Sequence, residues 1–280
     1  MIRIAASQYR FQSVASFDEF ARRVETHVAS AAEFGAKLLV MPEYLSFELL
    51  TVPGAGGIES LPQATQAYED LFKALSARHA IQVLAGTHLI ADGNNLRNTA
   101  HLFFPDGRIE RQAKNHLTPC EVTPWNLKPG DGLKIVDLGF ARAAMPVCYD
   151  IEFPELARQA RARGADILLV PSCTDDAHGY HRVRLCAAAR AIENQIYVAL
   201  SMTTGSLLSV PLMRANYGRA SLHTPCDYPY PPGGVLAEGE MNDDQVVCGD
   251  FDMAALARAR AGGSVKTWQD RRGDLYPLAT

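Results

Sequence analysis

Hydrophobic and polar positions along the chain follow two periods, one typical of strands and one typical of helices. Residues 2–8 largely alternate between apolar and polar side chains, which predicts a strand. Residues 16–35 then carry apolar side chains three and four positions apart, which predicts a helix that begins with Ser16 and Glu19 as a capping box. The segment 37–41, which is apolar from Leu38 onward, predicts a second strand. A β-α-β beginning of this kind indicates an α/β domain.

The alternation of elements continues to about residue 261. It predicts helices at 63–79, 154–163, 180–194 and 254–261, strands at 81–89, 97–104, 108–114, 134–138, 141–147, 165–171 and 196–202, and a terminal strand pair at 234–237 and 245–252. Segments 51–62, 118–132 and 208–232 are rich in glycine and proline or lack periodicity, so we expect loops there. Since no linker divides the chain, we expect one domain over residues 1–280, with a polar tail from about residue 262.

Two segments repeat one order of residues. Residues 35–42 and 164–171 each carry Gly-Ala, an apolar strand and a proline, with a predicted helix before them. This repetition indicates an internal two-fold pattern in the fold. Composition and periodicity do not distinguish a doubly wound sheet from a sandwich of two sheets.

Three polar residues with complementary chemistry follow predicted strands. Glu43 comes after the apolar run 38–41, Lys114 ends a hairpin strand, and Cys148 lies between an apolar run and a helix that begins near Pro154. A thiol near a helix N-terminus is expected to ionise more easily. A carboxylate can remove the thiol proton, and an ammonium can stabilise the oxyanion that forms when the sulfur attacks a carbonyl.

The segments around these residues resemble those of a known family. L-V-M-P-E at 39–43, K-x-H-L at 114–117 and V-C-Y-D-x-x-F-P-E at 147–155 occur in this order. Together they resemble the nitrilase superfamily of carbon–nitrogen hydrolases, over residues 2 to about 251. The form V-C-Y-D-x-E-F-P-E is most similar to a poorly characterised branch, some members of which carry an acetyltransferase-like domain that this chain is expected to lack. The resemblance implies a four-layer α-β-β-α sandwich.

The resemblance also implies a cofactor-free, thiol-dependent amidase. In this interpretation Cys148 is the nucleophile, and Glu43 is the general base and later the acid. Lys114 and the backbone amide of Tyr149 stabilise the oxyanion, and Glu121 pairs with Lys114. The expected substrate is a small amide, cleaved at a non-peptide C–N bond through a thioester.

Several other functions remain open for the same residues. A nitrile hydrolase or an N-acyltransferase would use the same triad. A non-catalytic scaffold would keep the fold but would not need the three residues together. A redox-sensing thiol at Cys148 would not need Glu43. Each residue alone is more often structural, but the ordered match favours catalysis.

The residues that contact the substrate are expected in loops around Cys148. Tyr149, Glu152, Trp125 and Asp175 are the candidates, in or near segments 51–62, 120–129, 173–180 and 208–232. Lys114 is the only basic residue assigned to this site from the sequence. The surplus of acids predicts a substrate that is neutral or positively charged.

Other side chains receive structural interpretations. Asp150 is expected to accept hydrogen bonds near a helix start, and Arg190 to pair with Glu193. A cluster of possible metal ligands has no standard zinc spacing, so we expect a loop and no metal there; its members are Cys173, Asp175, Asp176, His178 and His181.

Charge and composition argue against several other classes of function. The net charge of the 280 residues is −4, which gives no basic excess for nucleic acid. No apolar run approaches the roughly 18 residues of a membrane helix, and the N-terminus is interpreted as a strand, not a signal peptide. Six cysteines without CxxC spacing favour reduced thiols in the cytoplasm. Family resemblance predicts a homodimer or higher homo-oligomer, with contacts through the helix after Cys148 and the C-terminal tail.

Overall fold

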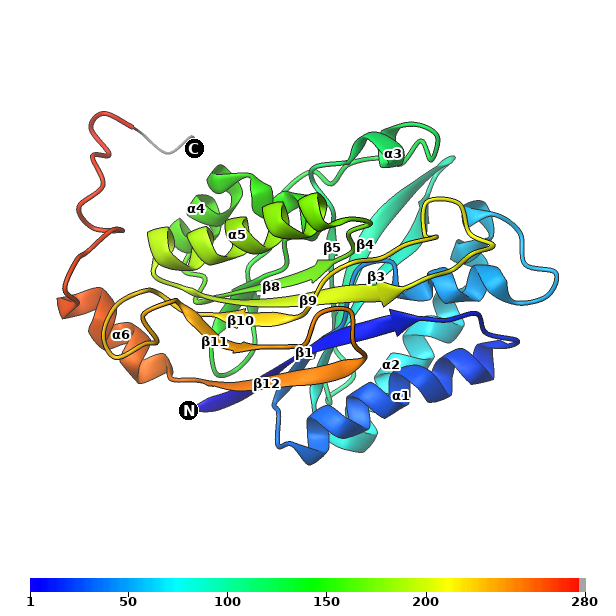
Figure 1. Cartoon of the computed structure of the whole chain (residues 1–280), viewed down its shortest axis with the longest axis horizontal. Coiled ribbons are helices and arrows are strands. Elements are labelled where there is room, and N and C mark those ends of the chain that lie inside the picture. The colour runs from blue at the N-terminus through cyan, green and yellow to red at the C-terminus, as the bar shows by residue number, and fades with distance from the viewer. Residues whose placement is uncertain (277–280) are drawn as a thin grey trace.

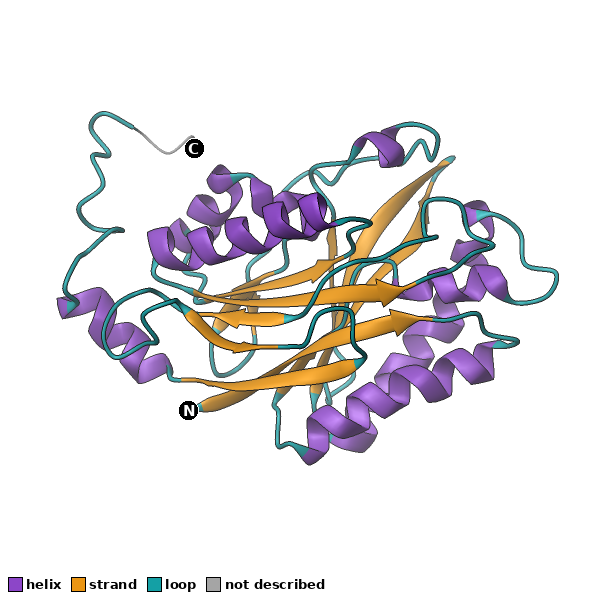
Figure 2. Cartoon of the chain, viewed as in Figure 1, coloured by secondary structure: helices purple, strands orange, loops and turns teal. Residues whose placement is uncertain are grey.

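A hydrogen-bonded sheet of twelve strands runs through the computed structural model, which describes residues 1–276 (Figures 1 and 2). Nine strands follow the order β5-β4-β3-β2-β1-β9-β8-β7-β6. The strands are β1 (Ile2–Phe11), β2 (Leu38–Val40), β3 (Gln82–Asp92), β4 (Asn95–Phe103), β5 (Ile109–Ala113), β6 (Val136–Asp137), β7 (Arg142–Ala144), β8 (Ile167–Ser172), β9 (Tyr197–Gly205), β10 (Ser221–His223), β11 (Val235–Glu238) and β12 (Gln245–Phe251).

Helices cover the outer faces of this sheet or lie at its ends (Figure 1). They are α1 (Phe17–Glu33), α2 (Thr65–His79), the single-turn α3 (Pro119–Val122), α4 (Pro154–Ala162), α5 (Ala177–Asn194) and α6 (Met253–Gly262), with 3₁₀ helices η1 (Leu45–Thr51), η2 (Ile58–Ala64) and η3 (Cys148–Glu152). Helices α1 and α2 lie on one side of the molecule, and α4 and α5 lie on the other (Figure 1).

Strand β1 joins the two halves of the sheet. Its first half pairs in parallel with β2 and antiparallel with β12, and its last four residues pair in parallel with β9. Strands β2 and β8, which carry the repeated Gly-Ala-strand-Pro order, therefore occupy equivalent places beside β1 and β9. This arrangement agrees with the internal two-fold pattern predicted from the sequence.

Alternating side chains of the central strands enter two separate hydrophobic cores. Leu38 and Val40 of β2 pack in one core together with β8, β9, α4 and α5, whereas Leu39 packs in the other with α1 and α2. Successive strand residues point to opposite faces, so β2 has apolar side chains on both. The two halves of the sheet therefore form the two inner layers of a four-layer structure, in the order helix, sheet half, sheet half, helix.

The amphipathic pattern of the first helix explains its position. The hydroxyl of Ser16 accepts a hydrogen bond from the Glu19 amide at 3.2 Å, which satisfies one free donor of the first turn. Phe20, Val24 and Val28 are buried along one face and pack into the core with α2. Both the cap and the face are those that the sequence predicted.

Most predicted elements are found, and the differences have physical reasons. Strand β7 is shorter than predicted because Pro146 has no N–H for a ladder hydrogen bond. The predicted terminal pair is wrong, since β11 pairs with β10 and β12 pairs with β1 over seven residues. Segment 208–232 contains β10, segment 51–62 lies partly in η1 and η2, and α5 begins three residues before its predicted start, with Asp176 as its cap.

Candidate active site

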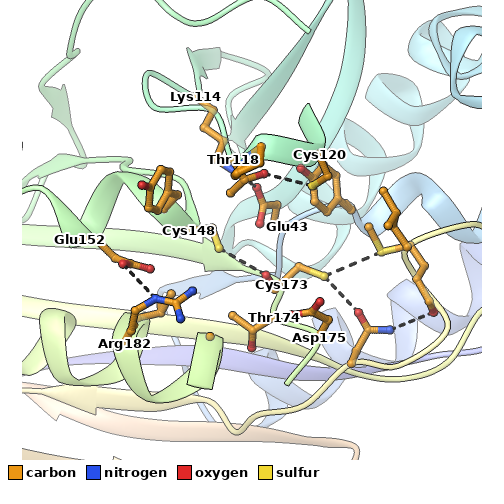
Figure 3. A pocket seen from close by; sticks show the side chains of 18 of the residues that line it. Glu43, Lys114, Thr118, Cys120, Cys148, Glu152, Cys173, Thr174, Asp175 and Arg182 are labelled. Carbon is orange, nitrogen blue, oxygen red and sulfur yellow. Dashed lines mark hydrogen bonds and ion pairs between the residues drawn. The ribbon is translucent and has the colours of Figure 1, made fainter. Parts of the chain in front are cut away.

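The three predicted catalytic side chains meet at one edge of the sheets. Glu43 follows β2, Lys114 follows β5, and Cys148 follows β7 after three residues. They line one cavity of about 280 Å³ together with Cys173, which follows β8 (Figure 3). Strands β2, β7 and β8 belong to one parallel set through β1 and β9, so their carboxyl ends lie at the same edge. Strand β5 runs in the same direction because it is antiparallel to β4, which is antiparallel to β3, the parallel neighbour of β2.

The turn that carries Glu43 depends on a close approach between two backbones. Gly86 in β3 has a φ of +65°, and a Cβ atom there would lie 1.9 Å from the carbonyl oxygen of Pro42. A glycine is therefore required at this position. Tyr44, next to Glu43, has a φ of 58°, and its amide donates to the hydroxyl of Thr87 at 2.8 Å. These contacts fix the carboxylate of Glu43 at the base of the cavity.

Lys114 is shared by two buried carboxylates. Its Nζ lies 2.8 Å from Oε1 of Glu43 and 2.7 Å from Oε2 of Glu121. All three side chains are at most 1% exposed to solvent. The backbone amide of Lys114 donates to the carbonyl of Asn98 at 2.8 Å, so the pairing of β4 with β5 continues to the lysine and positions it. The predicted contact between Glu121 and Lys114 is therefore present.

Glu121 is held by several donors besides Lys114. The amide and hydroxyl of Thr118 donate to its Oε2 at 2.9 and 3.0 Å, and the hydroxyl of Tyr44 donates to its Oε1 at 2.5 Å. A carboxylate with this many donors is fixed in position and kept ionised. Glu121 can therefore orient Lys114 without itself exchanging protons.

Asn98 connects the two carboxylates and was missed by the sequence interpretation. Its buried Nδ2 donates to Oε1 of Glu43 at 2.8 Å and to Oε1 of Glu121 at 2.9 Å. The signal available in the sequence was a polar residue inside a predicted strand, which does not by itself indicate which residues it contacts. We call Glu43, Lys114, Glu121 and Asn98 the floor of the site.

Cys148 has a strained backbone at the first position of η3. Its φ of 46° lies in the left-handed region, which costs a residue with a Cβ roughly 1–3 kcal/mol. Its Sγ donates to the carbonyl of Cys173 at 3.4 Å, and the side chain is buried beside Glu43 (Figure 3). The surrounding contacts must hold this conformation.

Asp150 provides several of these contacts. Its carboxylate accepts from the amide of Val147 at 3.0 Å, from the amide of His116 at 2.8 Å and from Nδ1 of His116 at 2.7 Å. The structural role predicted for Asp150 is confirmed by these bonds. Because His116 is two residues after Lys114, Asp150 also connects the segment of the lysine to that of Cys148.

Arg190 fixes η3 from the side of α5. It donates to the carbonyls of Ile151 and Glu152 at 3.0 and 2.9 Å and pairs with Glu193 at 3.1 Å. The predicted pair with Glu193 is confirmed. The two bonds to carbonyls could not be inferred from helical spacing, since they join different elements.

Burial controls the ionisation of the floor. It raises the pKa of Glu43 from 4.5 to about 7, with Lys114 opposing the rise and Glu121 adding to it. Burial would also raise the pKa of Glu121, but Lys114, Tyr44 and Thr118 together hold it below its ordinary value. Burial opposes the charge of Lys114, yet the two carboxylates raise its pKa well above 10.5. Near neutral pH, Glu43 is therefore the member of the floor that can gain or lose a proton.

The expectation of an easily ionised thiol is wrong. Burial raises the pKa of Cys148 well above its ordinary value, and the nearby Glu43 adds to the rise, while Lys114 opposes it. The element that begins at Cys148 is a five-residue 3₁₀ turn, and α4 begins only at Pro154, so little helix dipole acts on the sulfur. The resting thiol is neutral and needs a base.

The other predicted substrate-binding residues lie around the opening of the cavity. Tyr149, Glu152, Trp125 and Asp175 all line it. Trp125 also packs at right angles to the ring of Tyr44 with centroids 5.5 Å apart, so it is both a wall and a packed aromatic residue.

Arg182 was also missed, and it corrects the charge predicted for the site. It extends from α5 into the same cavity, and its Nε lies 3.3 Å from Oε2 of Glu152 (Figure 3). Lys114 is thus not the only basic residue there, and repulsion of a carboxylate no longer follows for a group close to Arg182. The sequence interpretation placed this residue in a helix but had no means to orient it toward Cys148.

The described part of the chain contains neither a candidate metal site nor a helix that could span a membrane. Within residues 1–276, no group of three or more His, Cys, Asp or Glu side chains is arranged to hold a metal ion. No helix in that part of the chain has both the length and the apolar character needed to cross a bilayer. All six cysteines are free thiols.

Comparison with known proteins assigns the family. The profile described as carbon-nitrogen hydrolase matches residues 3–261. The chain belongs to this family. As a carbon-nitrogen hydrolase it is an enzyme that acts on C–N bonds other than peptide bonds, which confirms the activity class predicted from the sequence.

Individual relatives and solved structures agree with this assignment. The chain is 37% identical to the probable hydrolase YhcX of Bacillus subtilis over 99% of its own length, and it spans 55% of that protein. It is 27% identical to human omega-amidase NIT2, with 99% and 97% of the two chains covered.

Two solved structures share the fold. Saccharomyces cerevisiae Nit3, a nitrilase-superfamily member, has a TM-score of 0.77 at 23% identity, with 93% of each chain covered. An amidase from Nesterenkonia sp. AN1 has a TM-score of 0.77 at 22% identity, with 99% and 98% covered. The family-profile match confirms the family resemblance, and these two structures confirm the four-layer sandwich fold.

Proposed function

We propose that this carbon-nitrogen hydrolase cleaves a small amide through a thioester on Cys148. The observation that carries the proposal is the buried contact set of the floor, in which Glu43 has a pKa of about 7 and lies beside both the thiol and Lys114. A base poised near neutrality is suited to accept a proton and return it.

Acylation begins with the neutral thiol. Sγ of Cys148 attacks the amide carbon while the carboxylate of Glu43 takes the S–H proton. The carbonyl oxygen becomes an oxyanion, stabilised by Lys114 and by the amide of Tyr149, which lies in the first turn of η3, where amides lack partners within the helix. The C–N bond then breaks, and Glu43 returns the proton to the departing ammonia or amine.

Deacylation uses the same groups in the same roles. Glu43 takes a proton from a water molecule, whose oxygen attacks the thioester carbon. The C–S bond breaks, the carboxylic acid leaves, and the sulfur regains a proton. Glu121 stays ionised throughout, since its pKa is below the ordinary value, and keeps Lys114 aimed at the reacting oxygen.

The relatives support an amide as the substrate. Several are named omega-amidase, and one solved variant of the Nesterenkonia amidase carries the acetamide moiety of fluoroacetamide covalently added at its active-site cysteine. Those observations belong to those proteins. They support the proposal here because the family and the fold are shared.

The proposal is tested by measuring the products formed from primary amides, from the matched nitriles, and from amides in the presence of an amine acceptor. We expect ammonia and carboxylic acid in equal amounts from the amides, and slower or no release from the nitriles. Faster turnover of nitriles would favour a nitrile hydrolase, and accumulation of an acylated amine in place of acid would favour an acyltransferase. Absence of turnover with every amide, nitrile and acceptor would contradict the proposal.

We also propose that the protein is a homodimer or a higher homo-oligomer, as the family resemblance predicts. Leu185 and Ile192 of α5 are exposed apolar side chains near the segments expected to form contacts. Light scattering at micromolar concentration should give at least twice the monomer mass, and a monomer would contradict it. The six free thiols support the proposed reducing, cytoplasmic location.

A further inference from the structure

We propose that the opening of the cavity recognises a zwitterionic group, an ammonium and a carboxylate on one carbon, on the acyl side of the substrate. This inference rests on the proposed amide hydrolysis and specifies its substrate class. We call Glu152, Arg182 and Asp175 the mouth of the site.

The mouth holds an ion pair that a ligand can reach. Nε of Arg182 lies 3.3 Å from Oε2 of Glu152, and both side chains line the cavity that contains Cys148. The side chain of Arg182 is 61% exposed and that of Glu152 is 16% exposed. Among residues 1–276, the contact of Arg182 with Glu152 is made through Nε, and its Nη atoms make no hydrogen bond, so the guanidinium keeps free donors.

No other cation of the cavity is available to a substrate carboxylate. Lys114 is the second basic side chain that lines it, and its ammonium already serves Glu43 and Glu121 at 2.8 and 2.7 Å. Recognition of a carboxylate therefore falls to Arg182, whose fork of donors matches two carboxylate oxygens.

A singly charged group would satisfy only one half of the pair. A carboxylate alone on Arg182 would bring a negative charge close to Glu152, and an ammonium alone on Glu152 would bring a positive charge close to Arg182. A group with both charges can pair its ammonium with Glu152 and its carboxylate with Arg182, so every charge keeps a partner. Asp175, an exposed acid in the same cavity, adds a second partner for the ammonium.

The pair is built on a fixed frame. Arg190 binds the carbonyls of Ile151 and Glu152, which holds the end of η3 against α5, the helix that also carries Arg182. Glu152 and Arg182 thus stay beside each other, and both lie on the same side of Cys148 in Figure 3. The backbone segments that carry the two charges are therefore held next to each other beside Cys148.

The test uses four primary amides that share one chain and differ only at the distal carbon. They are L-glutamine for the zwitterion, glutaramate for the carboxylate, 4-aminobutanamide for the ammonium and butanamide for the neutral group. The same series one methylene shorter and one methylene longer covers other depths in the cavity. Ammonia release gives kcat/KM for each amide.

We expect the zwitterion to have the largest kcat/KM of its series for at least one chain length, by about tenfold over the singly charged amides. Glu152→Gln should lower the ratio of zwitterion to carboxylate amide severalfold toward one, with Asp175 as the remaining partner of the ammonium. Arg182→Met should bring the ratio of zwitterion to ammonium amide close to one. Glu155→Gln and Arg22→Met remove the same charges at exposed positions outside the cavity, so both ratios should stay as in the natural chain.

Two results would overturn the inference. The first is turnover of these amides without preference for the zwitterion at any chain length, which would leave the proposed amide hydrolysis intact. The second is a preference that persists in both mouth variants, which would assign recognition to other residues. Absence of turnover with every amide, butanamide included, would instead contradict the proposed function on which the inference depends.

Discussion

The floor and the mouth of the cavity hold their charges in opposite ways. On the floor, Glu43, Lys114 and Glu121 are almost fully buried and joined by hydrogen bonds of 2.7–2.8 Å. At the mouth, Glu152 and Arg182 are partly exposed and joined by one 3.3 Å contact. Both regions line the cavity that contains Cys148, yet only the floor is closed to solvent.

This difference in burial assigns the catalytic chemistry to the floor and the choice of substrate to the mouth. In the floor, burial gives Glu43 a pKa of about 7, and the network fixes where each proton can be. At the mouth, solvent screens the pair, so a ligand can replace one partner at small cost. Changes in the floor should therefore reduce the rate for every substrate, and changes at the mouth should alter which substrate is preferred.

The largest effect is expected for the nucleophile. Cys148→Ala should abolish turnover of all amides because no thioester can form, and the fold should persist because only a sulfur atom is lost. Cys148→Ser should also be severely impaired, since a hydroxyl is much harder to ionise. Ammonia release and thermal unfolding measure the two properties. Cys186→Ala, in α5 and outside the cavity, is the matched control. Full activity of Cys148→Ala would contradict the mechanism.

The next largest effect is expected in the floor. Glu43→Gln and Lys114→Met should each lower the acylation rate by at least about a hundredfold, because a base or an oxyanion donor is lost. The two side chains contact each other at 2.8 Å, so the double variant should be hardly slower than the single ones. Single-turnover kinetics measure the rates. A double variant as slow as the product of both effects would indicate that the residues act independently.

A smaller effect, on pH dependence, is expected for Asn98. Glu43 must be ionised to accept the thiol proton, so kcat/KM should fall as the pH drops through about 7. Asn98→Leu removes a donor to the Glu43 carboxylate. Loss of a hydrogen bond to the charged form raises the pKa of an acid, so the midpoint should move to higher pH. Unfolding at each pH is the control, and a midpoint that stays or moves down would exclude this role.

The smallest effect is expected at the edge of the floor. Thr118→Val removes one hydroxyl donor to Glu121 but keeps the Thr118 amide, Lys114 and Tyr44 as donors. We expect a decrease in kcat/KM of about threefold to tenfold, in proportion to one hydrogen bond among several. A decrease in kcat/KM as large as that of Lys114→Met would show that the remaining donors cannot hold Glu121 in position without the Thr118 hydroxyl.

Residues that follow strands were the ones that sequence reasoning could place. Glu43, Lys114 and Cys148 each come after an apolar run, and the carboxyl ends of such runs meet at one sheet edge. The helices were predictable because caps and apolar faces are local, as at Ser16 and Phe20.

Contacts that depend on the packing of distant elements could not be predicted. Asn98 contacts Glu43 only because β4 pairs with β5 in one register and β3 passes close to the turn after β2. Arg182 reaches the cavity only because α5 begins at Ala177 and packs against η3. The neutral state of Cys148 follows from burial, which no local pattern measures.

The most direct test is to locate the acyl group during turnover. The enzyme is mixed with a primary amide that it hydrolyses, quenched in acid after milliseconds to seconds, and analysed by intact mass and peptide mapping. We predict one acyl group per chain, on Cys148, that forms with the first release of ammonia and is absent in Cys148→Ala. An acyl group on Cys120 or Cys173, which line the same cavity, or ammonia release by Cys148→Ala at the natural rate, would contradict the thioester mechanism.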